Sequence, residues 1–212
     1  MPNGSEAPRV SDLHKSAFWI YGVTAMVMRE PLAGLVRHIA SAGMGNVQVR
    51  LETLRVAVVL ALMSRLFLES GLYFDEVYLR ADSVARFPRR SYPIDFLSGL
   101  LHFLLAVGAS TAVSTVTSAF PVLVLAFLLY DCLWYAVSKL LRYTTATLIG
   151  AFAVASLRNA AVSAGLWAAL RASVGPEAAD EAGFVVVLGL TFCDIARLLR
   201  DYGRPEASAA AK

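Results

Sequence analysis

Long apolar segments are the feature that most restricts what this chain can form. Five of them reach the roughly 20 residues that a helix needs to cross the core of a bilayer. They cover 54–73, 93–117, 121–139, 145–170 and 183–200. Irregular backbone cannot face lipid, because its polar groups would lack hydrogen-bond partners there. The sequence therefore predicts an all-α, polytopic membrane bundle of five transmembrane helices, with six helices as the alternative.

Composition supports this class and excludes several others. Hydrophobic residues make up 58% of the 212 residues and charged residues only 17%, whereas soluble domains are closer to half apolar and a quarter charged. The net charge of +3 comes from basic residues scattered between the apolar runs, so we expect membrane lipids rather than nucleic acid as the partner. Cys132 and Cys193 lie in apolar runs without ligand spacing, and we expect neither a metal nor a cofactor.

The N-terminal part, 1–50, is predicted to be a tail that carries one short helix. Its apolar stretch 17–28 has only a dozen residues and is closed by Arg29, Glu30 and Pro31. That length is too short to span a bilayer, and we interpret the stretch as an interfacial helix, with a sixth span as the alternative. The bundle itself is expected over 51–204, followed by a disordered tail over 205–212.

Charge asymmetry predicts the orientation. We name the side at which 54–73 ends face X, and the opposite side face Y. By alternation, face X also receives the basic residues Arg80, Arg86, Arg89, Arg90, Lys139, Arg142, Arg200 and Arg204. The positive-inside rule then makes face X and the C-terminus cytoplasmic, most simply in a plasma (inner) membrane. An odd number of spans would leave the N-terminal tail outside, and this is the best argument for a sixth span.

Ionisable side chains inside the spans are the strongest functional signal. An unpaired charge at the bilayer centre costs about 3 kcal/mol on insertion scales, so such groups are expected to face inward and to pair. At 1.5 Å per residue, several of them lie roughly 12 Å or less from face X, whereas we expect no comparable charge in the half near face Y. The predicted ion or proton pathway is Glu69, Asp95, His102, Asp131 and Asp194, with Arg65, Arg158 and Asn159 as charge partners.

A polar stripe along the second span has two readings. With Asp95 and His102, it places Ser98, Ser110, Ser114 and Thr117 on one helical face. Such a face lines a proton path in one interpretation, in which His102 titrates near neutral pH. In the other it only allows close packing of helices in lipid.

Three functional hypotheses follow. The first is a proton or cation channel or transporter that uses the ionisable side chains inside the spans. We expect it to be a homo-oligomer, since five helices are few to enclose a pathway within one subunit. The second is a non-enzymatic membrane subunit, signalling protein or pore-forming effector whose ion pairs only hold the bundle together. The third is an intramembrane enzyme on a lipid-linked substrate, with His102 and Asp131 as base and acid and Arg89 and Arg90 on an anionic head group. Without a nucleophile or metal motif, a non-enzymatic role is favoured over the third.

Overall fold

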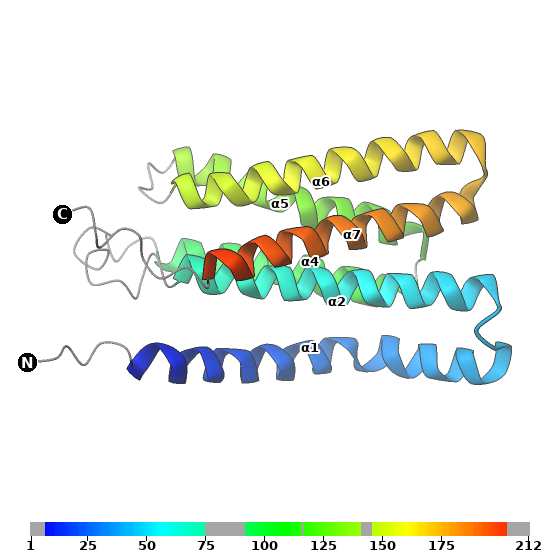
Figure 1. Ribbon diagram of the computed structural model, residues 1–212, viewed down its shortest axis with the longest axis horizontal. Helices are drawn as coiled ribbons and strands as arrows, with labels where there is room; N and C mark the ends of the chain where they lie inside the picture. The colour runs from blue at the N-terminus through cyan, green and yellow to red at the C-terminus, as the bar shows by residue number, and fades with distance from the viewer. Residues whose placement is uncertain (1–6, 75–91, 116, 141–145, 203–212) are drawn as a thin grey trace, which may run out of the picture.

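Long helices that lie side by side and alternate in direction make up the molecule (Figure 1). The computed structural model describes residues 7–74, 92–115, 117–140 and 146–202. In chain order the elements are α1 (Ala7–Ala42), α2 (Val47–Phe74), α4 (Tyr92–Ala112), the 3-10 helix η2 (Thr117–Ala119), α5 (Phe120–Leu140), α6 (Ala146–Ser173) and α7 (Pro176–Tyr202). No strand occurs within these ranges, and the predicted all-helical fold is confirmed.

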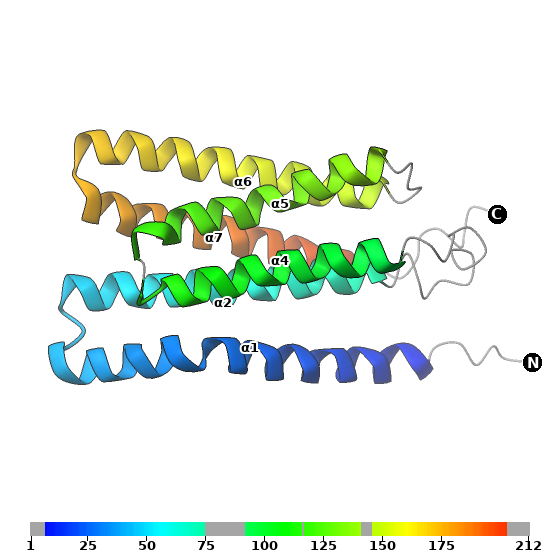
Figure 2. The ribbon, with the colours of Figure 1, turned by 180° about the vertical axis from the view of Figure 1, so that it is seen from behind.

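Helix α1 differs from the short helix expected near the N-terminus. The apolar stretch 17–28 is the middle of a helix of 36 residues, which continues through Pro31. A proline inside a helix removes one backbone hydrogen bond, and here burial of Met28 and Leu35 in the core offsets that loss. Figure 2 shows α1 lying along α2 for most of its length, and α1 also contacts α4. The sequence pattern does not predict this extension, because a proline such as Pro31 usually ends a helix.

Tight turns at face Y set the alternation of the helices. Gly43 has φ 75° and its N–H donates to the Ile39 carbonyl at 2.9 Å, which closes α1. Asn46 then begins α2, because its Oδ1 accepts the Gln48 N–H at 2.8 Å. Gly175, with φ 89°, and Pro176 form the corresponding turn between α6 and α7. Each turn reverses the chain within a few residues, so consecutive helices are antiparallel.

Helix α4 is shorter than the predicted span 93–117, since it ends at Ala112. The Thr111 hydroxyl donates to the Val107 carbonyl at 2.9 Å, and the Thr115 hydroxyl donates to the Thr111 carbonyl at 2.6 Å. Side-chain hydroxyls that compete for backbone groups weaken the end of a helix. Ser114 and Thr117 therefore lie beyond α4 and are exposed, and the predicted polar stripe is shorter than expected.

The core between the two ends of the bundle is apolar. Side chains from α2, α5 and α7 that are at most 1% exposed fill it: Val58, Val59, Leu62, Val124, Phe127, Leu128, Phe184 and Val187. Helix α2 is central to this packing because it contacts α1, α4, α6 and α7. Burying each such side chain contributes roughly 1.5–3 kcal/mol when the alternative is water.

Two helical segments in the described part are long and apolar enough to cross a membrane. They are Thr117–Leu140 and Pro176–Arg200, each with a mean hydropathy of 1.9. Only 28% and 33% of their apolar windows are buried, whereas a core helix of a soluble protein is mostly buried. This finding supports a membrane location, but the predicted bundle of five spans is not confirmed. Arg89, Arg90 and the tail 205–212 lie outside the described residues.

Close packing of α6 on α7 requires a glycine at position 183. A Cβ there would lie 2.7 Å from the Trp167 indole, which is buried and cannot swing away freely. At Gly189, in the same helix, a Cβ would meet nothing within 4 Å. We predict that Gly183→Ala lowers the stability by about 1–3 kcal/mol through overpacking.

The matched variant Gly189→Ala gains helix propensity and is expected to be neutral or slightly stabilising. Thermal unfolding of the purified protein in detergent micelles measures both variants. An equal effect of the two substitutions would contradict the packing argument.

Candidate functional site

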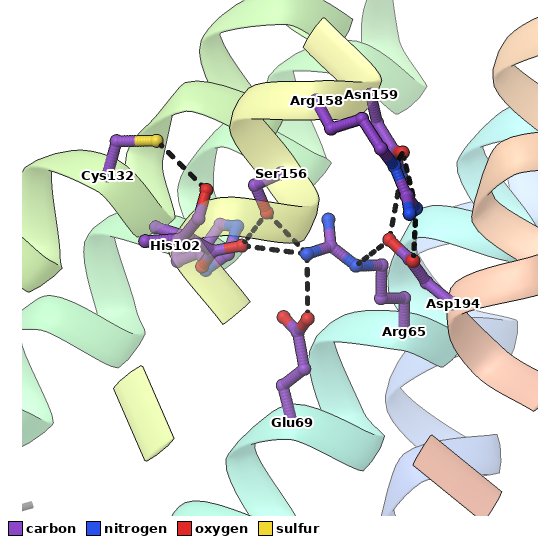
Figure 3. A network of polar contacts seen from close by, with 10 residues as sticks. Arg65, Glu69, His102, Cys132, Ser156, Arg158, Asn159 and Asp194 are labelled. Atoms are coloured by element: carbon purple, nitrogen blue, oxygen red, sulfur yellow. Dashed lines mark hydrogen bonds and ion pairs between the residues drawn. The ribbon is translucent and has the colours of Figure 1, made fainter. Parts of the chain in front are cut away.

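The guanidinium of Arg65 is the centre of a buried polar cluster with side chains from α2, α4, α5, α6 and α7 (Figure 3). Its Nη2 lies 2.7 Å from Glu69 Oε1, one turn further along α2, and 3.0 Å from Asp131 Oδ2 on α5. Its Nε lies 3.6 Å from Asp194 Oδ2 on α7. The Arg65 side chain is fully buried, and three carboxylates therefore share one cation that has no contact with the surroundings of the bundle.

Asp131 connects this cation to α4 and α6. Its Oδ2 accepts a hydrogen bond of 2.5 Å from the Ser156 hydroxyl, and Ser156 also contacts Arg65 Nη2. Its Oδ1 lies 3.7 Å from His102 Nδ1. The His102 ring packs against the rings of Phe127 and Tyr130, with centroid distances of 4.2 and 4.8 Å. Asp131 is thus placed between a fixed cation and a titratable imidazole.

Asp194 is held by a separate set of donors from α6. Asn159 Nδ2 donates to its Oδ2 at 2.6 Å, and Arg158 Nη2 donates to its Oδ1 at 3.0 Å. The side-chain oxygen of Asn159, Oδ1, in turn accepts hydrogen bonds from Arg158 Nη2 at 3.1 Å and from Arg158 Nε at 3.2 Å. The Arg158 side chain is 53% exposed, unlike the other members of the cluster. This half of the cluster has the character of a structural clamp between α6 and α7.

The structure brings together most of the residues that the sequence singled out. We use the name X cluster for Arg65, Glu69, His102, Asp131, Ser156, Arg158, Asn159 and Asp194. Ser156 is the member that sequence analysis missed, because a serine in an apolar span is also typical of simple helix packing. Its position two residues before Arg158 on α6 does not by itself indicate that Ser156 contacts Arg65 and Asp131.

The remaining predicted residues lie outside the X cluster. Ser98 contacts Tyr130, whose hydroxyl donates to the Ser98 carbonyl at 2.9 Å. Ser110 donates to the Val27 carbonyl at 3.0 Å and thereby ties α4 to α1. The side chain of Asp95 is not among those the structure describes. The stripe is thus divided: Ser98 and His102 line a cavity, Ser110 contacts α1, and Ser114 and Thr117 are exposed beyond α4.

A cavity of about 70 Å³ lies between the X cluster and face X. Its lining comes from α2, α4, α5 and α6: Leu66, Glu69, Ser70, Tyr73, Ser98, Gly99, His102, Tyr130, Asp131, Trp134 and Phe152. Tyr73 and Trp134 are about one turn closer to face X than Glu69 and Asp131. A space of this size holds several water molecules, since one water needs only about 10–15 Å³ of such volume. Water in this cavity would lie next to the carboxylates of Glu69 and Asp131.

Four buried polar atoms of the X cluster have no hydrogen bond among the described residues, and two of them, Arg65 Nε and Glu69 Oε1, take part in ion pairs instead. Arg65 Nη1 and His102 Nε2 are buried and have no hydrogen-bond partner among the described residues. Buried polar atoms are nearly always hydrogen-bonded, to protein or to water. In the described part of the chain, no three His, Cys, Asp or Glu side chains are arranged to hold a metal ion.

A second layer of charge lies near face Y, where none was expected. Glu52 and Arg55 of α2 are only 8% and 6% exposed. His38 Nδ1 lies 2.7 Å from Glu52 Oε2, and the Arg55 guanidinium lies 5.7 Å from the Phe184 ring centroid. Trp167 Nε1 donates to Asp180 Oδ1 at 3.1 Å. The sequence analysis did not predict this layer, because Glu52 precedes the predicted span 54–73 and Arg55 lies at its start.

Comparison with known proteins gives no match to a family model, a curated protein or a solved structure. Inferences about the function of this chain come from the geometry described above.

The central position of Arg65 generates a stability prediction. Arg65→Gln leaves Glu69, Asp131 and Asp194 without their shared cation, and breaking a buried ion pair in this way costs about 3–5 kcal/mol. Arg158→Gln removes a half-exposed cation from Asp194, whose carboxylate keeps its contacts with Asn159 and Arg65. We therefore expect this variant to lose about 1 kcal/mol of folding stability or less. Thermal unfolding in detergent micelles distinguishes the two variants, and equal losses would show that Arg65 is not the centre of the cluster.

Proposed function

We propose that this chain is an integral membrane protein that moves protons or another small cation, and that the X cluster is its binding site. The observation that carries the proposal is the position of Glu69, His102 and Asp131 together in the lining of one cavity. Carboxylates and an imidazole within a membrane domain are the groups from which proton and cation pathways are built.

The charge balance of the X cluster favours a cation as the transported species. Among the described side chains it contains the carboxylates of Glu69, Asp131 and Asp194, but only the guanidinium groups of Arg65 and Arg158. With His102 neutral, one negative charge is in excess. Burying an uncompensated charge is costly, so one bound proton or monovalent cation stabilises the cluster.

Six membrane crossings explain the exposed apolar surface better than five. Large apolar side chains are exposed on helices from both ends of the chain, among them Met26, Val36, Leu104, Val154 and Phe192. Lipid would cover them at no cost, whereas water would not. An antiparallel bundle in which α1 also crosses puts the start of α1 and the end of α7 on face X. The basic residues near that face make it cytoplasmic.

The apolar core suggests how movement of the cation is controlled. Val58, Leu62 and Phe127 lie between the X cluster and face Y and are at most 1% exposed. A cation cannot cross such a layer without water or polar groups. In this proposal the apolar layer closes the pathway toward face Y, and transport requires a change in helix packing.

A homo-oligomer is part of this proposal. The half-exposed Arg158 is costly in lipid unless a neighbour covers it. On the same exposed face of α6, Ala161, Gly165 and Ala169 follow four-residue spacing, which is typical of close helix contacts in membranes.

The oligomer has its own test. Gly165→Leu places a large side chain in the proposed contact, where a Cβ now meets nothing within 4 Å, and we expect it to shift the protein toward monomers. Gly189→Leu, on an equally open glycine of α7, serves as the control. Chemical cross-linking in native membranes measures the shift, and a monomeric wild type would refute the oligomer.

Proton flux into liposomes tests the proposed function. Protein reconstituted in vesicles with a pH gradient and a potassium-diffusion potential is expected to move protons. Asp131→Asn and His102→Ala are each expected to reduce this flux at least tenfold, because they remove the carboxylate and the imidazole at the cavity.

The exposed variant Ser114→Ala is the control and should keep wild-type flux. Size-exclusion profiles of the variants separate loss of flux from loss of folding. Equal flux in all four proteins would eliminate the transport role and leave the cluster as a purely structural set of ion pairs.

A further inference from the structure

The cavity next to the X cluster combines aromatic side chains with buried carboxylates. Tyr73, Tyr130, Trp134 and Phe152 line it together with Glu69 and Asp131. We propose that this cavity binds a small organic ammonium ion and exchanges it for a proton. The inference rests on the proposed cation transport and specifies the chemical class of its substrate.

Charge matching is the first argument. The X cluster carries one negative charge in excess among the described side chains when His102 is neutral, so a single positive charge neutralises it. A proton and a monovalent ammonium ion both satisfy this requirement, and both cannot be bound at once without creating an excess of positive charge. Competition between them for Glu69 and Asp131 couples the movement of one to that of the other.

The aromatic lining distinguishes an organic cation from a metal ion. Hard metal ions are held by cages of several oxygen ligands, mostly carboxylates, whereas the cavity lining contains only the two carboxylates of Glu69 and Asp131, and no three His, Cys, Asp or Glu side chains in the described part of the chain are arranged to hold a metal ion. Alkylammonium ions are instead attracted by the faces of Trp and Tyr rings, and such rings form the recognised sites for them. The Tyr130 hydroxyl donates to the Ser98 carbonyl at 2.9 Å, which holds this ring in place.

His102 and Asp131 are neighbours in the cavity lining. The His102 side chain is 5% exposed and lines the cavity. Its Nδ1 faces Asp131 Oδ1 at 3.7 Å. When His102 is neutral, the negative charge of Asp131 is not neutralised by the imidazole, and an ammonium ion in the cavity would lie next to it.

The volume of the cavity sets the size of the substrate. About 70 Å³ is more than a single water requires but far below the roughly 300–1,000 Å³ of pockets for drug-sized ligands. The site thus fits a small ammonium ion with one or a few carbon atoms rather than a bulky amphiphile.

Binding of radiolabelled methylammonium to the purified full-length protein in detergent micelles tests this inference. The wild type is expected to bind methylammonium, and excess unlabelled methylammonium should displace the label at least tenfold more effectively than sodium chloride. Methanol, a neutral molecule of similar size, should not displace it. Binding should weaken as the pH falls, because protons compete for the same carboxylates.

Variants of the lining localise the binding. Trp134→Leu is expected to weaken binding at least fivefold, and Trp134→Phe, which keeps an aromatic ring, should restore most of it. Tyr135→Leu is the matched control on α5, because Tyr135 lies against Gly150 and Lys139 instead of the cavity. Size-exclusion profiles again check that each variant is folded.

The outcomes separate this inference from the proposed function. If methylammonium does not bind, or sodium displaces it equally well, while His102-dependent proton flux persists in liposomes, the ammonium site is refuted and proton transport stands. If methylammonium binds and Trp134→Leu abolishes binding, while proton flux is found neither without nor with a methylammonium gradient across the liposomes, the binding site stands and transport, including the exchange, is refuted.

Discussion

The ion pair between Arg65 and its three carboxylate neighbours is the constraint on which the rest of the structure depends. A buried guanidinium needs compensating charge and hydrogen bonds, because its transfer out of water is otherwise prohibitive. Glu69 supplies one partner from the same helix, but Asp131 and Asp194 come from α5 and α7. The three helices must therefore meet at one depth and with fixed rotations, and Ser156 adds α6 to the same point.

This requirement divides the bundle into three layers. The X cluster and its cavity lie toward face X, the apolar core lies in the middle, and the pairs around Glu52, Arg55 and Asp180 lie toward face Y. Polar layers specify which helices are neighbours, because mismatched packing leaves a charge unpaired, whereas apolar side chains tolerate many arrangements. The middle layer then seals one polar end from the other. Such an arrangement suits a protein that admits a small cation from one side at a time.

The two halves of the X cluster differ in what they can do. Asp194 is saturated by Asn159, Arg158 and Arg65 and has little capacity for another ligand. Asp131 and Glu69 border the cavity, which gives them space beside their carboxylates that Asp194 lacks. The same kind of side chain thus stabilises the bundle at one position and is available for binding at another. Access to the cavity, rather than residue type, separates the two roles.

The amino-acid sequence determined the helical class and the inward-facing charges. The first follows from the length of the apolar runs, and the second from the free-energy cost of an unpaired charge in lipid. An apolar run with one or two charges can only be a helix whose charges find partners, so the sequence alone identifies Arg65, Asp131, Arg158 and Asp194.

The length of α1 and the early end of α4 were not predictable with the same rules. Pro31 breaks most helices but is tolerated when Met28 and Leu35 are buried beside it, and only packing decides that. Tertiary structure alone also decided which carboxylate meets which cation, which of them borders a cavity, and that Ser156, Glu52 and Arg55 belong to polar layers. These properties depend on the relative rotation of helices distant in sequence, and a pattern read along one chain contains no information about that rotation.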